Sequence, residues 1–302
     1  MKKIIITGAH GQDGIILSKI LKNKNYKVFG VVKKTNKKKN FRGVKYYKCD
    51  LINYKNIYKI FNKIKPDCIV HFGCKNPSYK ELGKKNDFFH NNFKAIKNLS
   101  KYIIANNKKI KLIFPGSSQM YGNKKKRVNE NQKFSPNNSY ARFRVSGHNY
   151  LMKCKKKYNL FITTTILFNH DSVFRNKKFI LPRVIKAIKM GNKNFIKKIS
   201  KESICADFSH AYDICYAIYL LIKSKNNIDK IILSSNKLTY LNDIINFIYK
   251  INGYNYRLNK TSRVNKNIIG NNKLAKKLLK WRMKKNIFIA SKEMLINKNL
   301  LF

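Results

Sequence analysis

Residues 3–14 read Lys-Ile-Ile-Ile-Thr-Gly-Ala-His-Gly-Gln-Asp-Gly and join an apolar run to three evenly spaced glycines. The apolar run predicts a buried strand, and residues 12–24 carry apolar side chains at helical spacing. Gly8 permits a tight turn, Gly11 lets backbone amides approach a pyrophosphate, and Gly14 lets the helix pack closely on the strand. The alternative is a glycine turn that binds no ligand. The position of this turn between a strand and a helix favours a dinucleotide site, which includes Gln12 and Asp13.

The first half of the chain continues this alternation of strands and helices. We expect strands at residues 26–32, 44–49, 67–72, 110–115 and 161–168, and helices at residues 53–64, 87–107 and 138–157. Strands that alternate with helices predict an α/β fold with a doubly wound parallel sheet, the Rossmann arrangement. We therefore predict a Rossmann domain at residues 1–168.

The pattern is looser after residue 169. We expect helices at residues 180–191, 211–223, 241–252 and 273–280, with short strands at residues 195–198 and 230–234. These elements predict a smaller C-terminal α/β substrate-binding part at residues 169–302. The path of the chain can pass between the two parts more than once.

The charge balance is extreme, because 67 Lys and Arg residues face only 13 Asp and Glu residues, for a formal net charge of +54. Such a charge is typical of proteins that bind nucleic acids or membrane surfaces. The lysines are spread along the chain, with neither a basic tail nor an RNA-binding aromatic signature. We therefore attribute the charge to compositional bias, and expect no specific nucleic-acid partner.

The sequence predicts a protein of the reducing cytoplasm. No apolar run approaches the roughly 18 residues that a membrane span needs, so we expect no membrane partner. The N-terminus reads as a first strand and lacks the apolar core of a signal peptide. The six cysteines form no Cys-x-x-Cys pair, which gives a zinc site no support. His170 and His210 are lone histidines, and we expect no metal.

The residues after the second strand bear on the choice of cofactor. Lys33, Lys34 and Thr35 stand where NAD-preferring folds place an acid for the ribose 2′-hydroxyl, and no acid occurs between Asp13 and Asp50. Two lysines suit a 2′-phosphate, so NADP is predicted over NAD. The alternative is that Lys33 and Lys34 are simply two of the many lysines in this chain and bind no phosphate. Asp50 and Leu51 follow the third strand, where the aspartate can accept from the adenine amine.

Several motifs together resemble the extended short-chain dehydrogenase/reductase superfamily, and within it the GDP-mannose 4,6-dehydratases. The likeness covers nearly the whole chain. Its most specific carriers are the Gln-Asp of the glycine turn and the string Leu-Phe-Asn-His-Asp-Ser at residues 167–172. The others are Lys33–Thr35, Asn92, Ser117–Gly122, Asn129-Glu130, Ser139–Ala141, Asp207–Asp213 and residues 260–281.

The resemblance implies an internal redox cycle on a nucleotide sugar, from GDP-mannose to GDP-4-keto-6-deoxymannose. Tyr140 matches the catalytic tyrosine that takes the 4-hydroxyl proton while NADP takes the C4 hydride. Ser117 matches a threonine that holds the 4-oxygen. Arg144 stands for the family's lysine and keeps its charge, although arginine and lysine are not interchangeable. Gln119 stands for the glutamate that removes the C5 proton, and an amide is no general base at neutral pH.

The resemblance also implies substrate contacts and an assembly. Ser118 and Asn169 match substrate-binding positions, and Arg183 and Lys186 match basic residues for the diphosphate. Ala206 replaces a substrate-binding arginine. A homodimer or homotetramer through the Tyr140 helix is implied.

Three other functions stay open at this point. An epimerase or ketoreductase on the same fold needs redox chemistry at C4 but no C5 base. A catalytically degraded NADP-binding protein would retain the fold and lose turnover. A nucleic-acid binder rests on charge alone.

Overall fold

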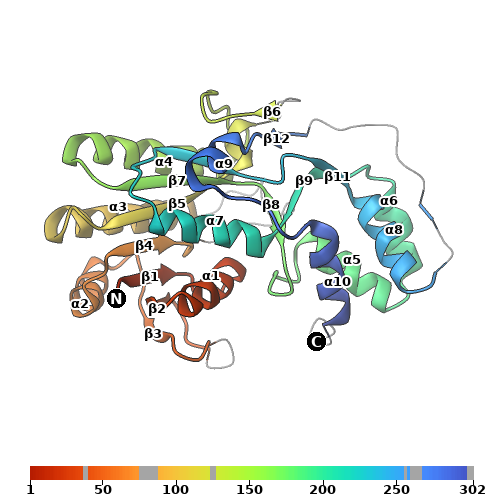
Figure 1. Cartoon of the computed structure of the whole chain (residues 1–302), viewed down its shortest axis with the longest axis horizontal. Helices are drawn as coiled ribbons and strands as arrows, with labels where there is room; N and C mark the ends of the chain where they lie inside the picture. The colour runs from red at the N-terminus through yellow and green to blue at the C-terminus, as the bar shows by residue number, and fades with distance from the viewer. Residues whose placement is uncertain (37–39, 75–87, 123–126, 255–256, 259–266, 298–302) are drawn as a thin grey trace. The chain divides into compact units, whose positions relative to one another are not determined.

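The computed structural model describes residues 1–36, 40–74, 88–122, 127–254, 257–258 and 267–297. The chain divides into two compact units (Figure 1). Unit 1 comprises Met1–Gly122, Lys133–Ile166 and Cys215–Ile231, and unit 2 comprises Asn123–Gln132, Leu167–Ile214 and Ile232–Phe302. The predicted boundary at residues 168 and 169 stays a prediction.

The centre of the fold is a seven-stranded parallel sheet, as the sequence predicts. Its strands run in the order β10-β7-β5-β4-β1-β2-β3. In chain order they are β1 (Lys3–Thr7), β2 (Lys27–Val32), β3 (Lys45–Lys48), β4 (Cys68–His71), β5 (Lys111–Ser117), β7 (Ile162–Leu167) and β10 (Lys230–Leu233). In the register of β1, Ile5 lies opposite Phe29 of β2 and Ile69 of β4. The prediction of a doubly wound α/β sheet is confirmed.

Helices cover both faces of this sheet. One face carries α2 (Tyr54–Ile64), α3 (Phe88–Asn106) and α4 (Ser139–Tyr158), and the other carries α1 (Gln12–Asn23) and α7 (Ala211–Lys223) (Figure 1). Ile5, Phe61, Leu99 and Phe143 are fully buried between the sheet and the α2–α4 layer. Burying such side chains stabilises a fold by about 1.5–3 kcal/mol each. This core fixes α4, which carries the predicted catalytic tyrosine.

Two buried histidines make unit 1 sensitive to acid. Burial lowers the pKa of His71 to about 3, with Arg144 adding repulsion, and burial with Lys230 nearby lowers the pKa of His148 to about 4. Below about pH 6.5 these two histidines become protonated in the unfolded chain but stay neutral in the folded chain, because their pKa values are lower in the fold. The free energy of unfolding therefore falls as the pH falls. Near pH 5 we expect a loss of about 2 kcal/mol per histidine.

Urea unfolding at about pH 7 and pH 5, in salt that screens the general charge repulsion, checks this expectation. In His148→Asn, which removes one of the two groups, the loss between the two pH values should be about half that of the wild type. Equal free energies of unfolding at both pH values in the wild type would contradict it.

Unit 2 contains two small sheets and five helices among its described residues. β8 (Asn169–Asp171), β9 (Cys205–His210) and β11 (Leu238–Tyr240) form one sheet, and β6 (Arg127–Val128) pairs with β12 (Ile269–Gly270). The helices are α5 (Ile180–Lys189), α6 (Lys193–Ser200), α8 (Leu241–Ile251), α9 (Lys273–Leu279) and α10 (Ile287–Ile296). Their buried apolar faces form a second core.

The predicted strand at residues 195–198 is wrong, because this stretch lies within α6. The Asn192 side chain accepts a hydrogen bond from the Phe195 amide (2.9 Å) and caps the helix. Ile196 and Ile199 are buried three residues apart, which is helical spacing. The sequence prediction also missed β9 and α10.

In the part of the chain that the structure describes, no helix has both the length and the apolar character that crossing a membrane requires.

Candidate active site

The glycine turn lies tightly against the end of β4. Gly8 has φ +67°, and a Cβ there would lie 2.7 Å from the carbonyl carbon of Phe72. A Cβ on Gly14 would lie 2.6 Å from Ala9 Cα. Only glycine fits both positions, the first for its backbone angle as well as its space. The amide of Gly73 also donates to the Thr7 hydroxyl (3.0 Å), which joins β1 to the end of β4.

The N-terminus of α1 has the features of an anion-binding site. Gly11 is the N-cap in an extended conformation, and its helix has no side-chain cap. Backbone amides at the start of a helix favour an anion, since they carry partial positive charge. The Gln12 side chain donates to Asp13 Oδ1 (3.1 Å), so these two side chains pair with each other beside the turn.

Basic and acidic side chains meet after β2 and β3. Lys33 Nζ lies 3.2 Å from Asp50 Oδ2, and the Lys33 side chain is 72% exposed. Lys34 is exposed and Leu51 is buried. An ion pair this exposed contributes at most about 1 kcal/mol, so Lys33 can exchange it for a phosphate.

We expect the variant Lys33→Ala, Lys34→Ala to bind NADP about tenfold to a hundredfold more weakly, with NAD binding nearly unchanged. A charge-assisted hydrogen bond contributes about 1.5–3 kcal/mol, and only NADP carries the 2′-phosphate. Calorimetric titration with each cofactor measures the ratio. Lys24→Ala, Lys27→Ala is the matched control, because it removes two exposed charges at the other end of α1 and β2. Equal losses for both cofactors would contradict the assignment.

An amide pair fixes the orientation of Gln119. Ser117 ends β5, and its hydroxyl accepts from the Gln119 amide (3.3 Å) at the start of the 3-10 turn Ser118–Tyr121. Asn138 caps α4 by accepting from the Ala141 amide (2.8 Å), so its nitrogen faces away from the helix. That nitrogen donates to Gln119 Oε1 (3.2 Å). Because the backbone orients Asn138, Gln119 must present its own nitrogen on the side away from Asn138.

Tyr140 and Arg144 lie one turn apart on α4. The guanidinium carbon of Arg144 is 5.1 Å from the centre of the Tyr140 ring, and the two side chains hydrogen-bond. Arg144 is only 2% exposed and donates from Nη1 to the Pro115 carbonyl (2.6 Å). Burial alone would lower the pKa of Arg144, but attraction to Tyr140 and Cys74 outweighs it and raises the pKa. The pair therefore combines a hydroxyl with a permanent cation.

The four predicted catalytic residues thus come together in unit 1. Ser117 and Gln119 stand at the end of β5, Arg144 reaches the backbone of the same strand, and Asn138 links Gln119 to α4. The described glutamates, Glu130, Glu202 and Glu293, all belong to unit 2. Glu81 lies outside the described residues.

The predicted substrate residues of unit 2 lie on two of its elements. Asn169 begins β8 and lies opposite Phe208 of β9. Arg183 and Lys186 share one face of α5, three residues apart. The Arg183 guanidinium lies 5.1 Å from the centre of the Phe195 ring, and Lys186 is exposed.

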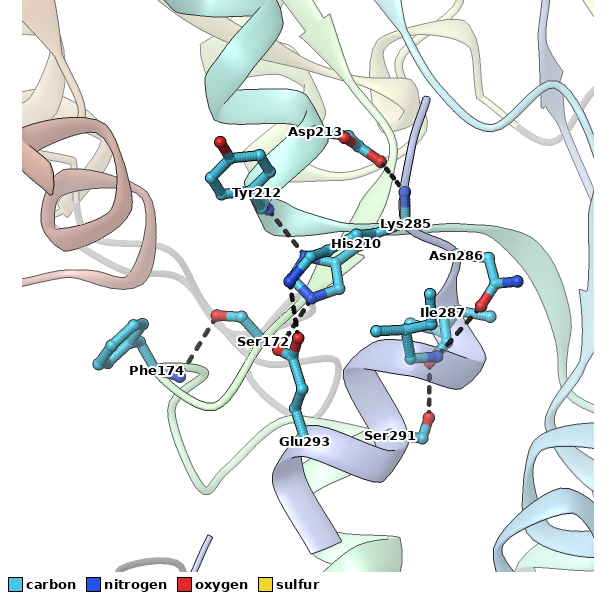
Figure 2. A network of polar contacts seen from close by, with 11 residues as sticks. Ser172, Phe174, His210, Tyr212, Asp213, Lys285, Asn286, Ile287, Ser291 and Glu293 are labelled. Carbon is cyan, nitrogen blue, oxygen red and sulfur yellow. Dashed lines mark hydrogen bonds and ion pairs between the residues drawn. The ribbon is translucent and has the colours of Figure 1, made fainter. Parts of the chain in front are cut away.

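A polar network around His210 ties the C-terminal helix to β9 (Figure 2). His210 Nδ1 accepts from the Tyr212 amide (3.0 Å), so the proton sits on Nε2, which donates to Glu293 Oε2 (3.0 Å). Asp213 accepts from the Lys284 and Lys285 amides (2.9 and 2.7 Å). Both ring nitrogens of His210 are therefore engaged in hydrogen bonds within the fold. Among the described residues, no three His, Cys, Asp or Glu side chains cluster as metal ligands.

Sequence reasoning missed several residues that shape the site. Asn138 had a readable signal, because an asparagine just before a helical pattern is a preferred N-cap. His71, Cys74 and Pro115 had none, since they meet Arg144 only through the fold.

Comparison with known proteins gives a consistent result. The family model described as GDP-mannose 4,6 dehydratase matches residues 5–294. GDP-mannose 4,6 dehydratase 1 of Arabidopsis thaliana is 24% identical over 94% of this chain and 86% of its own length. GDP-mannose 4,6 dehydratase of Dictyostelium discoideum is 23% identical over 97% of this chain and 94% of its own length.

Solved structures share the fold. A UDP-glucuronic acid 4-epimerase from Bacillus cereus superposes with a TM-score of 0.83 at 19% identity, over 99% of this chain and 100% of its own. A dTDP-glucose 4,6-dehydratase from Bacillus anthracis superposes with a TM-score of 0.82 at 16% identity, over 99% of this chain and 98% of its own.

Proposed function

Because the chain belongs to the GDP-mannose 4,6-dehydratase family, we propose that it converts GDP-mannose to GDP-4-keto-6-deoxymannose with bound NADP. The observation that carries the proposal is the Tyr140 hydroxyl held beside a buried guanidinium on α4. A base for an alcohol proton needs such a cation, because a phenol otherwise ionises near pH 10.

The first step is the removal of the 4-hydroxyl proton. We propose Tyr140 as the group that accepts this proton, and the Arg144 guanidinium beside it would stabilise the negative charge of a phenolate. The Ser117 hydroxyl, which accepts from the Gln119 amide, keeps its own hydrogen for the sugar 4-oxygen. When bound, NADP would supply the redox chemistry as acceptor of the C4 hydride and later as its donor to C6, and the proton taken from the 4-hydroxyl balances the one that C5 regains in the product.

The second step is the loss of water across C5 and C6. The 4-keto group makes the C5 proton acidic, and the C6 hydroxyl leaves with that proton as water. Gln119 stands at the site expected to receive the proton, but its amide nitrogen is a donor. We infer that elimination is the slow step in this chain.

The binding parts of the proposal follow from charge and geometry. The N-terminus of α1, with Gly8, Gly11 and Gly14, would hold the diphosphate of the cofactor. Lys33 and Lys34 would hold the 2′-phosphate, which favours NADP over NAD, with Asp50 and Leu51 at the adenine. Ser118, Asn169, Arg183 and Lys186 are the proposed substrate contacts. We propose a cytoplasmic homodimer or homotetramer that assembles through α4.

A second candidate is a nucleotide-sugar 4-epimerase or ketoreductase. The orientation of the Gln119 amide favours it, because these reactions need hydride and proton transfer at C4 and no base at C5. A hydrogen-bond donor at this position can hold a sugar oxygen.

The experiment is incubation of the protein with NADP and GDP-mannose, followed by mass spectrometry and proton NMR of the sugar nucleotide. Loss of one water supports the dehydratase. An unchanged mass with inverted C4 supports the epimerase. Bound NADP with unchanged GDP-mannose would contradict both the dehydratase and the epimerase assignment on this substrate. The remaining explanations would be a different sugar-nucleotide substrate or a protein that has lost turnover.

A further inference from the structure

Arg144 occupies a socket built from both β5 and α4. Its guanidinium donates to the Pro115 carbonyl (2.6 Å) and lies 5.6 Å from the ring centre of Phe114 and 5.3 Å from that of Phe143. The ring of Tyr140 is the third, at 5.1 Å. A planar cation gains from several aromatic faces and from a fixed acceptor in its plane.

His71, the last residue of β4, and Cys74, three residues beyond it, complete the socket. The Cys74 thiol hydrogen-bonds with Arg144, and its sulfur lies 3.4 Å from His71 Nε2. His71 Nδ1 lies 2.8 Å from the Thr7 hydroxyl, which in turn accepts from the Gly73 amide. A continuous row of polar contacts therefore runs from β1 to the guanidinium.

Arg144 fixes the donor and acceptor roles at its end of this row of contacts. A guanidinium carries donors only, so the Cys74 sulfur must accept from it. Burial, with the charge of Arg144, lowers the pKa of His71 to about 3, so the imidazole is neutral at physiological pH. The socket thus holds one cation, and His71 supports the thiol without adding a second.

We propose that Cys74 is a positioning residue that holds the Arg144 guanidinium against Tyr140, and that this socket is shaped for arginine rather than lysine. The inference rests on the proposed role of Tyr140 as base. A lysine ammonium is a compact point charge, so it cannot contact Pro115, Cys74 and Tyr140 in one fixed plane. Arg144→Lys should therefore lower activity.

The first test is the pH profile of C4 oxidation in the variants Cys74→Ala, Cys74→Ser and Arg144→Lys. In Cys74→Ala we expect kcat to fall about tenfold, with KM unchanged, and the rise of kcat to move to higher pH by about one unit. Serine keeps an acceptor and should restore most of the rate. Arg144→Lys should lose about tenfold or more. Cys154→Ala, which removes a buried thiol at a distant position of α4, is the matched control.

The second test needs no turnover. Urea midpoints of Cys74→Ala, Arg144→Met and the double variant form a double-mutant cycle. The socket predicts that the double variant loses clearly less than the sum of the single losses. This result supports the socket even if the wild type fails to turn over, in which case only the proposed function fails. Additive midpoint shifts, a Cys74→Ala profile that superimposes on the wild type, or faster turnover in Arg144→Lys would each overturn the inference.

Discussion

Replacing Tyr140 by phenylalanine is expected to lower the rate of C4 oxidation by about 10²–10⁴-fold, the usual contribution of a positioned acid or base. Phenylalanine keeps the ring that lies 5.1 Å from the Arg144 guanidinium, so the packing of α4 should survive. It removes only the hydroxyl that takes the sugar proton. NADP should still bind, because the glycine turn and the lysines after β2 are untouched.

The measurement is a single-turnover experiment with excess protein, which follows the near-ultraviolet absorbance of the reduced nicotinamide. Tyr158→Phe is the matched control, since Tyr158 is the last residue of the same helix and lies away from Arg144 in sequence. A Tyr140→Phe variant that reduces the cofactor as fast as the control would show that another group takes the proton.

Replacing Gln119 by glutamate is expected to raise the rate of water elimination by about 10²–10⁴-fold. The carboxylate can keep the hydrogen bond from the Asn138 amide, because that bond is accepted by an oxygen in the wild type as well. The change converts the other end of the side chain from a donor into a base. C4 oxidation should change little, since Tyr140 and Arg144 are not altered.

Two readings test this: the rate at which the C5 proton of the sugar exchanges with deuterium from the solvent, and the mass of the product. Gln132→Glu adds the same charge at a site where the wild-type oxygen only accepts from the Asn129 amide (3.3 Å), and serves as control. If Gln119→Glu leaves both exchange and elimination at wild-type rates, elimination is not the reaction of this chain, and the epimerase or ketoreductase becomes the preferred assignment.

The parts of the site that sequence reasoning found are local in the chain. The glycine turn and the Tyr140–Arg144 pair each lie within a few residues, so strand, turn and helix periodicity are enough to bring their groups together. The strands of unit 1 were predictable for the same reason. They are short apolar runs, and parallel strands buried on both faces need no alternation.

The socket around Arg144 was not predictable, because its members come from separate parts of the fold: β5, α4, and the end of β4 with the residues that follow it. Cys74 and Pro115 lie 70 and 29 residues before Arg144 in the sequence, and only the neighbouring positions of β4 and β5 bring them to it. Their types carry no signal, since a lone cysteine and a lone proline occur in many settings.

Strand β9 was missed because most of its buried residues, namely Asp207, Ser209 and His210, are polar. Asp207 is 1% exposed and accepts from the amides of Ser235 (2.7 Å), Asn236 (3.1 Å) and Gly270 (3.1 Å). These partners follow β10 or belong to β12, so a window of sequence around residue 207 reads as a polar loop. Hydrogen bonds from distant backbone make such burial possible.

The most direct test of the central claim is a trapping experiment on wild-type protein loaded with NADP and mixed with GDP-mannose. The account predicts that reduced nicotinamide forms transiently, and that quenching with borodeuteride places deuterium at C4 of the sugar, because Tyr140 and Arg144 generate a 4-keto intermediate. If neither reduced nicotinamide nor deuterium at C4 is found while calorimetry shows both ligands bound, this chain does not carry out redox chemistry on GDP-mannose.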